Sequence, residues 1–196
     1  MQIYKALSRL LDYPDAALLD HAEELRPLIR NEDGFRDDEQ PGLEHLLDWM
    51  TSHSLLEIQM LYVQTFDLTP EHSLHMTHHV YGESRDRGPA LVDLSEHYKA
   101  SGLAADTGEL PDYLPLLLEY ASTLDRLQSR LFLHGMVQVL ENMAARLESL
   151  RNPYAPLLRT LERRARLGQG VDKGERGAPV QGPSGDSTRP LGGQRP

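Results

Sequence analysis

The sequence predicts an all-α protein built as a single helical domain. Apolar residues recur at helical spacing in most segments, no segment alternates polar and apolar residues over the length of a strand, and no hairpin-type turn dipeptides separate the apolar runs. A chain of 196 residues can bury a real core without disulfides. We therefore expect one helical bundle over residues 1–167.

The composition changes sharply after Leu167. Residues 168–196 hold 8 of the 15 glycines and 4 of the 13 prolines, and few of them are apolar. Such a segment cannot bury enough apolar surface to offset the entropy lost on ordering. We expect residues 168–196 to be a disordered tail.

Charge and cysteine content narrow the class of protein. The absence of cysteine removes disulfides and thiolate metal sites, and the net charge of −10 disfavours nucleic acid. The N-terminus differs from a signal peptide, and no apolar run reaches the length of a membrane span. These features predict a cytoplasmic protein with no stable membrane insertion. Six arginines against two glutamates in residues 143–167 indicate either a solvated face or an electrostatic role in partner choice.

The first helices follow from local patterns. Leu7, Leu10 and Leu11 form one apolar face, and the letters DYP end that helix. Asp15 is placed to cap a second helix over residues 16–29, which we expect Pro27 to bend or shorten.

Two more helices are predicted between residues 43 and 66. In the second, Ser54 and Glu57 have the spacing of a capping box. The apolar positions expected to be buried in the two helices are Leu43, Leu46, Leu47 and Met50, then Leu55, Ile58, Leu61, Tyr62 and Phe66.

Thr69 as N-cap and Pro70 at the first helical position predict a helix that Gly82 ends. The following helix begins near residue 89 and closes at Gly102. Helices over residues 113–121, 125–151 and 153–166 complete the set, the last behind Asn152 as its cap. The longest carries the apolar stripe Met136, Val139, Leu140, Met143, Leu147 and Leu150.

Histidines cluster in the segment EHSLHMTHHVYGESRDRG. On one continuous helix, His72, His75 and His79 would fall within an arc of about 60°. Imidazoles are sensible ligands for zinc or iron, so a helical metal-binding protein is an alternative hypothesis. The other interpretation is a polar helix face, because Gly82 ends the helix before Glu83 could complete the row.

Two further segments have unusual chemistry. In GESRDRG, Arg85 and Arg87 are expected in a turn, where they either pair with local acids or offer donors to a partner. In ELPDYLPLLLEY, Asp112 is either the N-cap of the next helix or part of a stiff acidic loop that could bind arginine. No Walker loop, GxSxG elbow or HExxH motif is present.

The segments LLDYPD, YVQTFDL, HVYGESRDRGPALVDLSEHY, ELPDYLPLLLEY and NPYAPLL occur in this order over nearly all of residues 1–167. Together they resemble the NarJ branch of the TorD/DmsD-like chaperones, the molybdenum cofactor assembly chaperones of respiratory nitrate reductase. The resemblance implies an all-helical cytoplasmic protein without catalytic activity or cofactor. It implies binding to the apo form of the catalytic α subunit, including its N-terminal segment, before the finished enzyme docks at the membrane. The chaperone is not part of the mature enzyme.

The resemblance also implies a client-peptide site. Tyr62 and Phe66 match the helix motif of the wider family, and its recurring loop corresponds to Glu109, Pro111, Asp112 and Tyr113. Tyr113 stands where many relatives have histidine, so a role for a titratable imidazole does not carry over. We include Arg85 and Arg87 as a possible client-facing edge. An acidic surface suits a basic client segment, and moderate affinity is expected because the client must be released.

Overall fold

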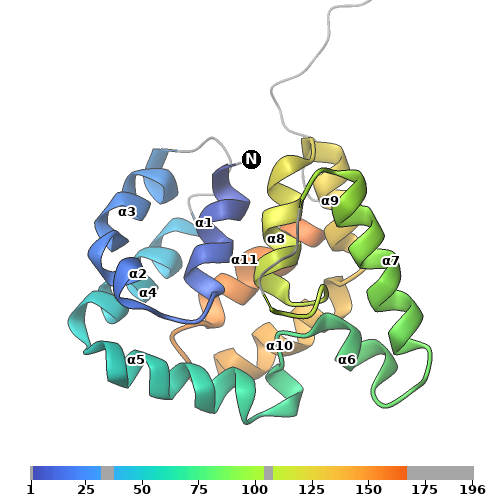
Figure 1. Ribbon diagram of the computed structural model, residues 1–196. Coiled ribbons are helices and arrows are strands. Elements are labelled where there is room, and N and C mark those ends of the chain that lie inside the picture. Colours follow the sequence, from blue (N-terminus) through green and yellow to red (C-terminus); the bar gives the residue numbers. More distant parts are fainter. Residues whose placement is uncertain (1, 32–37, 104–107, 167–196) are drawn as a thin grey trace, which may run out of the picture.

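The computed structural model describes residues 2–31, 38–103 and 108–166, and within these ranges every regular element is helical (Figure 1). The all-α prediction is confirmed. The prediction for residues 168–196 lies outside the described residues. No helix in the described ranges is long and apolar enough to cross a membrane.

The elements run in order along the chain. They are α1 Gln2–Leu11, α2 Ala16–Asp20, α3 Ala22–Asn31, α4 Gln40–Ser52, α5 Leu55–Tyr62, the π-helical η1 Val63–Asp67, the 3₁₀ turn η2 Pro70–His72, α6 Met76–Tyr81, α7 Arg87–Ala100, α8 Leu114–Thr123, α9 Arg126–His134, α10 Val137–Ser149 and α11 Ala155–Ala165.

The first helices show where local signals succeed and where they fail. The Asp15 carboxylate accepts the Leu18 N–H at 2.7 Å and caps α2, as predicted. The expected single helix over residues 16–29 is wrong, however, because the chain breaks at His21 between α2 and α3. Pro27 lies inside α3, where its missing N–H removes only one helical hydrogen bond.

The capping box of α5 is present, since Ser54 and Glu57 satisfy each other's backbone N–H groups. The helix then widens into a π-helical turn, in which the Leu68 N–H donates to the Val63 carbonyl at 2.9 Å. Most of the predicted apolar positions in α4 and α5 lie in one continuous core, with Leu55 and Leu61 only partly buried.

Two predicted helices are interrupted. The helix expected from Thr69 to Gly82 is wrong, because only η2 and α6 form and the residues between them turn away to pair with another segment. The helix expected over residues 125–151 divides into α9 and α10 at Gly135 and Met136. Gly82 does end α6, with a left-handed φ of 52°.

The helices are arranged in two groups bridged by α11 (Figure 1). The N-terminal helices lie on one side and α6–α9 on the other, while α1 packs against α8 at the centre. Ser8 on α1 donates to the Pro115 carbonyl at the start of α8 at 2.9 Å. α11 packs against α4, α9 and α10 and so contacts both groups.

The arginines of α11 mostly stabilise the fold. Arg159 contacts Glu148 at 2.7 Å, Arg163 contacts Asp38 at 2.6 Å, and Arg164 contacts Glu39 at 3.0 Å. The Arg164–Glu39 pair is almost entirely buried. The basic segment 143–167 is therefore extensively neutralised by ion pairs within the chain.

Candidate functional site

A short antiparallel backbone pairing joins the ELPDY loop to the segment before α6. The Leu114 N–H donates to the Leu74 carbonyl at 2.8 Å, and the Met76 N–H donates to the Asp112 carbonyl at 3.0 Å. These bonds use the Leu74 carbonyl and the Met76 N–H, which would make helical bonds if the helix were continuous. The loop therefore has a fixed backbone conformation at the centre of the molecule.

Asp112 is fully buried beneath this pairing and binds three side chains. Its carboxylate accepts the Thr77 N–H at 3.1 Å, the Thr77 hydroxyl and the His75 Nδ1–H at 3.1 Å. The Arg87 guanidinium lies 3.5 Å away and also donates to the Thr77 hydroxyl at 3.0 Å. Burial alone would raise the pKa of Asp112, but the hydrogen bonds from His75 and Thr77 outweigh it and lower that pKa.

The structure gives Asp112 and Arg87 roles other than an N-cap of α8 and a turn residue. The N-cap of α8 is Tyr113, whereas Asp112 caps the first turn of α6 through Thr77. The N-cap prediction for Asp112 is therefore wrong, because the loop turns its side chain toward α6. Arg87 is the first residue of α7, and its guanidinium pairs within the chain.

A second network supports the side chain of Tyr113. Its hydroxyl donates to Asp12 Oδ1 at 3.2 Å and lies 2.8 Å from the Tyr62 hydroxyl, which is also 3.1 Å from the Leu11 carbonyl. Burial raises the pKa of Tyr113, and the nearby Asp12 carboxylate adds to that rise. Burial likewise raises the pKa of Tyr62. Both phenols therefore stay protonated at physiological pH and act as hydrogen-bond donors.

An aromatic cluster lies below the two tyrosines. Tyr62 packs edge-on against Phe66 and Tyr154, with ring centroids 5.0 Å and 6.1 Å away, and against Tyr13 at 5.4 Å. Tyr62 and Phe66 are only 2% and 3% exposed, whereas Tyr13 is 45% exposed. In this conformation Tyr62 and Phe66 are too buried to contact a partner directly. They can affect binding only by positioning neighbouring residues such as Tyr13 and Tyr113.

The structure thus separates the predicted site residues into buried and accessible groups. Tyr62, Phe66 and Asp112 are buried, while Pro111 and Tyr113 are half-buried and Glu109 is exposed. Arg85 lies exposed in the turn before α7. The structure adds two residues that the sequence had not marked as site residues, Asp12 and Tyr13. Their position in the LLDYPD segment was the signal that could have indicated them.

The histidines do not form the predicted row. His72 lies in η2, His75 precedes α6, and His79 lies within α6, so no single helix carries all three. His79 contacts the Ser73 carbonyl at 2.7 Å, and burial lowers the pKa of its imidazole. Among the described residues, no group of three potential ligands is placed to hold a metal ion. The metal-binding hypothesis therefore loses its geometric basis.

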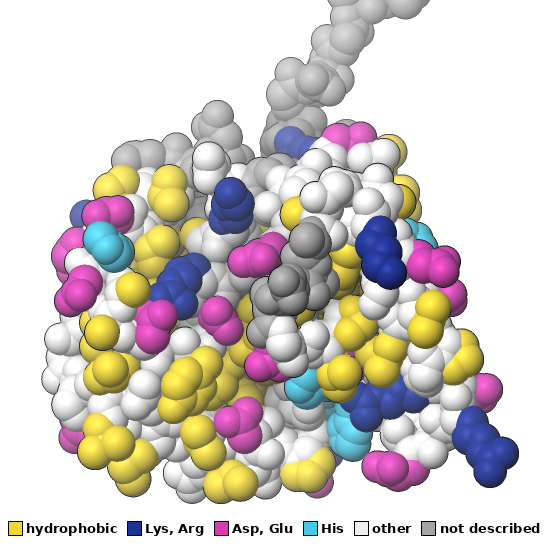
Figure 2. All heavy atoms as spheres, in the orientation of Figure 1, with side chains coloured by type: hydrophobic (Ala, Val, Ile, Leu, Met, Phe, Trp, Pro, Cys, Tyr) yellow, Lys and Arg dark blue, Asp and Glu magenta, His cyan; other side chains and the backbone are white. Residues whose placement is uncertain are grey.

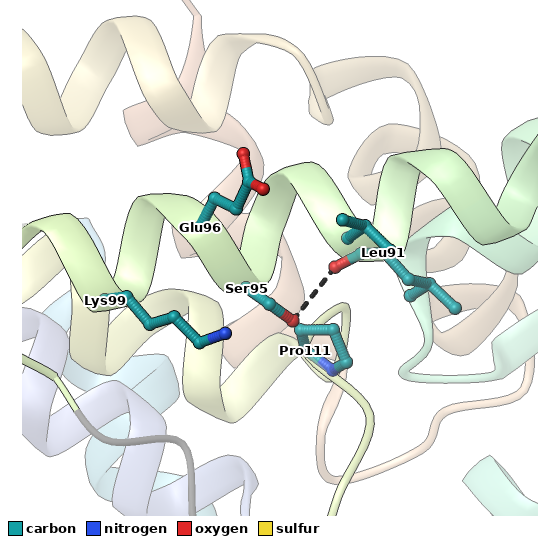
Figure 3. Close-up of a pocket in the computed structure, with 6 residues that line it drawn as sticks. Leu91, Ser95, Glu96, Lys99 and Pro111 are labelled. Atoms are coloured by element: carbon teal, nitrogen blue, oxygen red, sulfur yellow. Dashed lines mark hydrogen bonds between the residues drawn. The ribbon is translucent and has the colours of Figure 1, made fainter.

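Two grooves flank α7. One, with a volume of ≈ 310 Å³, lies between α7 and the ELPDY loop (Figure 3). Its lining residues are Leu91, Val92, Ser95, Glu96, Lys99 and Pro111. The Ser95 hydroxyl donates to the Leu91 carbonyl at 3.1 Å, so it is already paired within its own helix. Figure 3 shows Pro111 opposite the α7 side chains.

The second groove has a volume of ≈ 210 Å³ and lies where α6, α7, α8, α9 and α10 converge. Its walls are largely apolar, and two methionines, Met76 and Met136, contribute to them. Methionine adapts its shape to different apolar partners. Thr77 lines this groove and also binds Asp112, so the groove adjoins the buried network. Figure 2 shows acidic and apolar side chains side by side near the middle of the face that it displays.

The site thus combines a fixed loop, a half-buried tyrosine, an exposed glutamate and two neighbouring grooves on one helical scaffold. A family model described as nitrate reductase delta subunit matches residues 33–160, and the chain belongs to this family.

Several similar proteins are named as nitrate reductase assembly chaperones. The chain is 37% identical over 167 residues to the nitrate reductase molybdenum cofactor assembly chaperone NarJ of Escherichia coli K12, covering 85% of this chain and 71% of that protein. It is 37% identical over 161 residues to the probable chaperone NarW of the same strain, covering 82% and 67%. It is 34% identical over 158 residues to the probable chaperone NarJ of Bacillus subtilis, covering 81% and 85%. The predicted resemblance to NarJ-type chaperones is confirmed.

Proposed function

We propose that this protein is a system-specific chaperone for respiratory nitrate reductase. It binds the apo form of the catalytic α subunit, including its N-terminal segment, and assists insertion of the molybdenum cofactor and assembly of the complex before membrane docking. It acts in the cytoplasm, has no catalytic activity of its own and leaves before the enzyme is mature. The observation that carries the proposal is the match, over 85% of the chain, to a protein named for this task.

The site supports a role in peptide binding. Tyr113, Pro111 and Glu109 lie on a loop whose backbone is already paired, so little entropy is lost when a partner binds. We assign these three residues, with Asp12 and Tyr13 beside them, to the contact with the client. Tyr62, Phe66 and Asp112 hold that surface in place from below.

Charge and shape indicate what kind of segment fits. The net charge of −10 attracts a basic segment and speeds its encounter with the protein. The apolar grooves beside α7 can accept the nonpolar face of an amphipathic helix. A basic, amphipathic N-terminal segment of the α subunit matches both features.

Isothermal titration calorimetry with the N-terminal peptide of a cognate α subunit tests the proposal. We expect a dissociation constant of roughly 0.01–10 μM that rises with salt concentration, because opposite charges contribute to binding. Tyr113→Ala should weaken binding about tenfold, and Glu109→Gln by about threefold.

Glu24→Gln on α3 is the matched control for the loss of one negative charge, because Glu24 is exposed and pairs with His21 at the surface. It should leave the affinity within about twofold of the unsubstituted protein. Absence of heat for both the peptide and the purified apo subunit would overturn the proposal.

A further inference from the structure

Two irregular pieces of backbone meet behind the aromatic cluster. One is the π-helical turn η1, which continues α5. The other is the α10–α11 connection, where Arg151 has a φ of 53° and is the non-glycine residue with positive φ in the described part of the chain. π-turns and left-handed non-glycine residues both cost free energy and occur often at functional sites.

The α10–α11 connection has the hydrogen bonds of a Schellman motif. The Asn152 N–H donates to the Leu147 carbonyl at 2.9 Å, and the Arg151 N–H donates to the Glu148 carbonyl at 3.0 Å. Glycine usually occupies the left-handed position of this motif, which here holds arginine. The motif fixes the direction in which the next side chain, Asn152, leaves the helix end.

The Asn152 side chain joins the two irregular segments. Its Nδ2 donates to the Thr65 hydroxyl in the middle of η1 at 2.9 Å, and its Oδ1 accepts the Tyr154 N–H at 2.9 Å. Thr65 and Tyr154 are both buried. One amide group therefore fixes the π-turn from one side and the start of α11 from the other.

The two segments that Asn152 joins carry aromatic side chains that pack against Tyr62. The Tyr154 ring packs edge-on against Phe66 at 5.1 Å and against Tyr62 at 6.1 Å. Tyr62 in turn bonds the hydroxyl of Tyr113, the last residue of the ELPDY loop. A displacement of η1 would therefore move the group that sets the position of the Tyr113 hydroxyl.

We propose that Asn152 is a positioning residue of the client site, acting through Thr65 and Tyr154 to hold Tyr62 under Tyr113. The inference rests on the proposed function for its client. It gives the NPY segment, which the client contacts do not use, a defined role: it locks the π-turn on which the tyrosine pair depends.

The test combines binding with a local probe of the π-turn. Asn152→Ala and Thr65→Val each remove the linking hydrogen bond, and each should weaken peptide binding in calorimetry by about fivefold to tenfold. The Leu68 amide, which closes the π-turn, should exchange its hydrogen faster in both variants. Thr65→Ser keeps the hydroxyl, so its peptide affinity and its Leu68 exchange rate should both stay close to those of the unsubstituted protein. The double variant should lose little more than Asn152→Ala alone, because Asn152→Ala already removes the bond that Thr65→Val breaks.

Asn142→Ala is the matched control, since Asn142 lies exposed on α10 and its side chain accepts a hydrogen bond from Gln138 at 3.5 Å. It should bind like the unsubstituted protein. If the unsubstituted protein binds the peptide and Asn152→Ala binds equally well, the positioning role is refuted while the chaperone function stands. If the unsubstituted protein itself binds neither peptide nor apo subunit, both proposals fall together.

Discussion

Asp112 gives the sharpest test of how the site is built. Its carboxylate is fully buried and accepts hydrogen bonds from His75 and from both the backbone and the hydroxyl of Thr77. Asp112→Ala removes every one of these acceptors at once. The loop and α6 then lose the side-chain contacts that hold them together, although the backbone pairing remains.

The expected cost follows from which donors can find water. The Thr77 N–H is buried, and leaving it without an acceptor costs about 1–3 kcal/mol. Arg87 and His75 are 26% and 31% exposed, so they partly recover hydration and the full penalty of a broken buried pair does not apply. We expect a loss of about 3 kcal/mol in the free energy of unfolding for Asp112→Ala. Asp112→Asn keeps one acceptor for Thr77 and should lose about 1 kcal/mol.

Urea denaturation followed by circular dichroism measures both values. The pKa of Asp112 is lower in the folded protein than in the unfolded chain, so its charge stabilises the fold above the unfolded value of about 3.9. That contribution is lost as the pH falls through the folded pKa. The stability difference between the unsubstituted protein and Asp112→Asn should therefore be smaller below about pH 4 than at pH 5.

Asp93→Asn, at an exposed position on α7, is the control and should change stability by less than about 0.5 kcal/mol. An Asp112→Ala protein as stable as this control would refute the view that the buried carboxylate holds the loop against α6. A difference for Asp112→Asn that does not shrink in acid would show that the charge is not what matters.

Four further substitutions test the packing and the backbone geometry of the fold, each by urea denaturation. Gly42→Ala would place a Cβ 2.7 Å from Pro156, so α4 and α11 must separate, and we expect a loss of about 1–3 kcal/mol; an unchanged midpoint would contradict this close approach. Gly82→Ala should cost about 1 kcal/mol, because the φ of Gly82 is left-handed. Gly88→Ala should be neutral or stabilising, because Gly88 lies within α7 with open space where the new Cβ would lie. Equal effects at the two glycines would refute the strain argument. Leu140→Ala, at a fully buried position of α10, should cost about 2–5 kcal/mol, and a loss below 1 kcal/mol would not fit its place in the core.

Elements defined by local contacts could be predicted from the sequence. The Ser54–Glu57 capping box and the Asp15 cap depend on residues three positions apart, and both form as expected. The buried stripe of α10 was predicted in its centre, at Leu140, Met143 and Leu147. Its last position was wrong, because the helix end turns Leu150 toward solvent with 64% of it exposed.

The breaks in the helices could not be predicted in the same way. The Thr69–Pro70 signal is a good local helix start, but Leu74 and Met76 bond to backbone groups nearly forty residues later in the chain. These tertiary hydrogen bonds form in place of the helical ones, and the helix is therefore interrupted. The histidine row failed for the same reason, since it assumed a helix that the pairing interrupts. The family resemblance identified the loop residues from the sequence. Which of them are accessible and which are buried supports became clear only from their burial in the structure.

The division of the site into accessible and buried residues is consistent with the moderate affinity that the proposed function requires. Because the loop before Tyr113 is already fixed by backbone pairing and by Asp112, a client does not have to order it. The accessible part is small, however, and most of the aromatic area at Tyr62 and Phe66 is already buried against the protein itself. Under the proposed function, a client gains well-oriented contacts at Tyr113 and Glu109 but only limited apolar area. Preorganisation then favours the correct segment, and the limited area allows the release that the proposal requires.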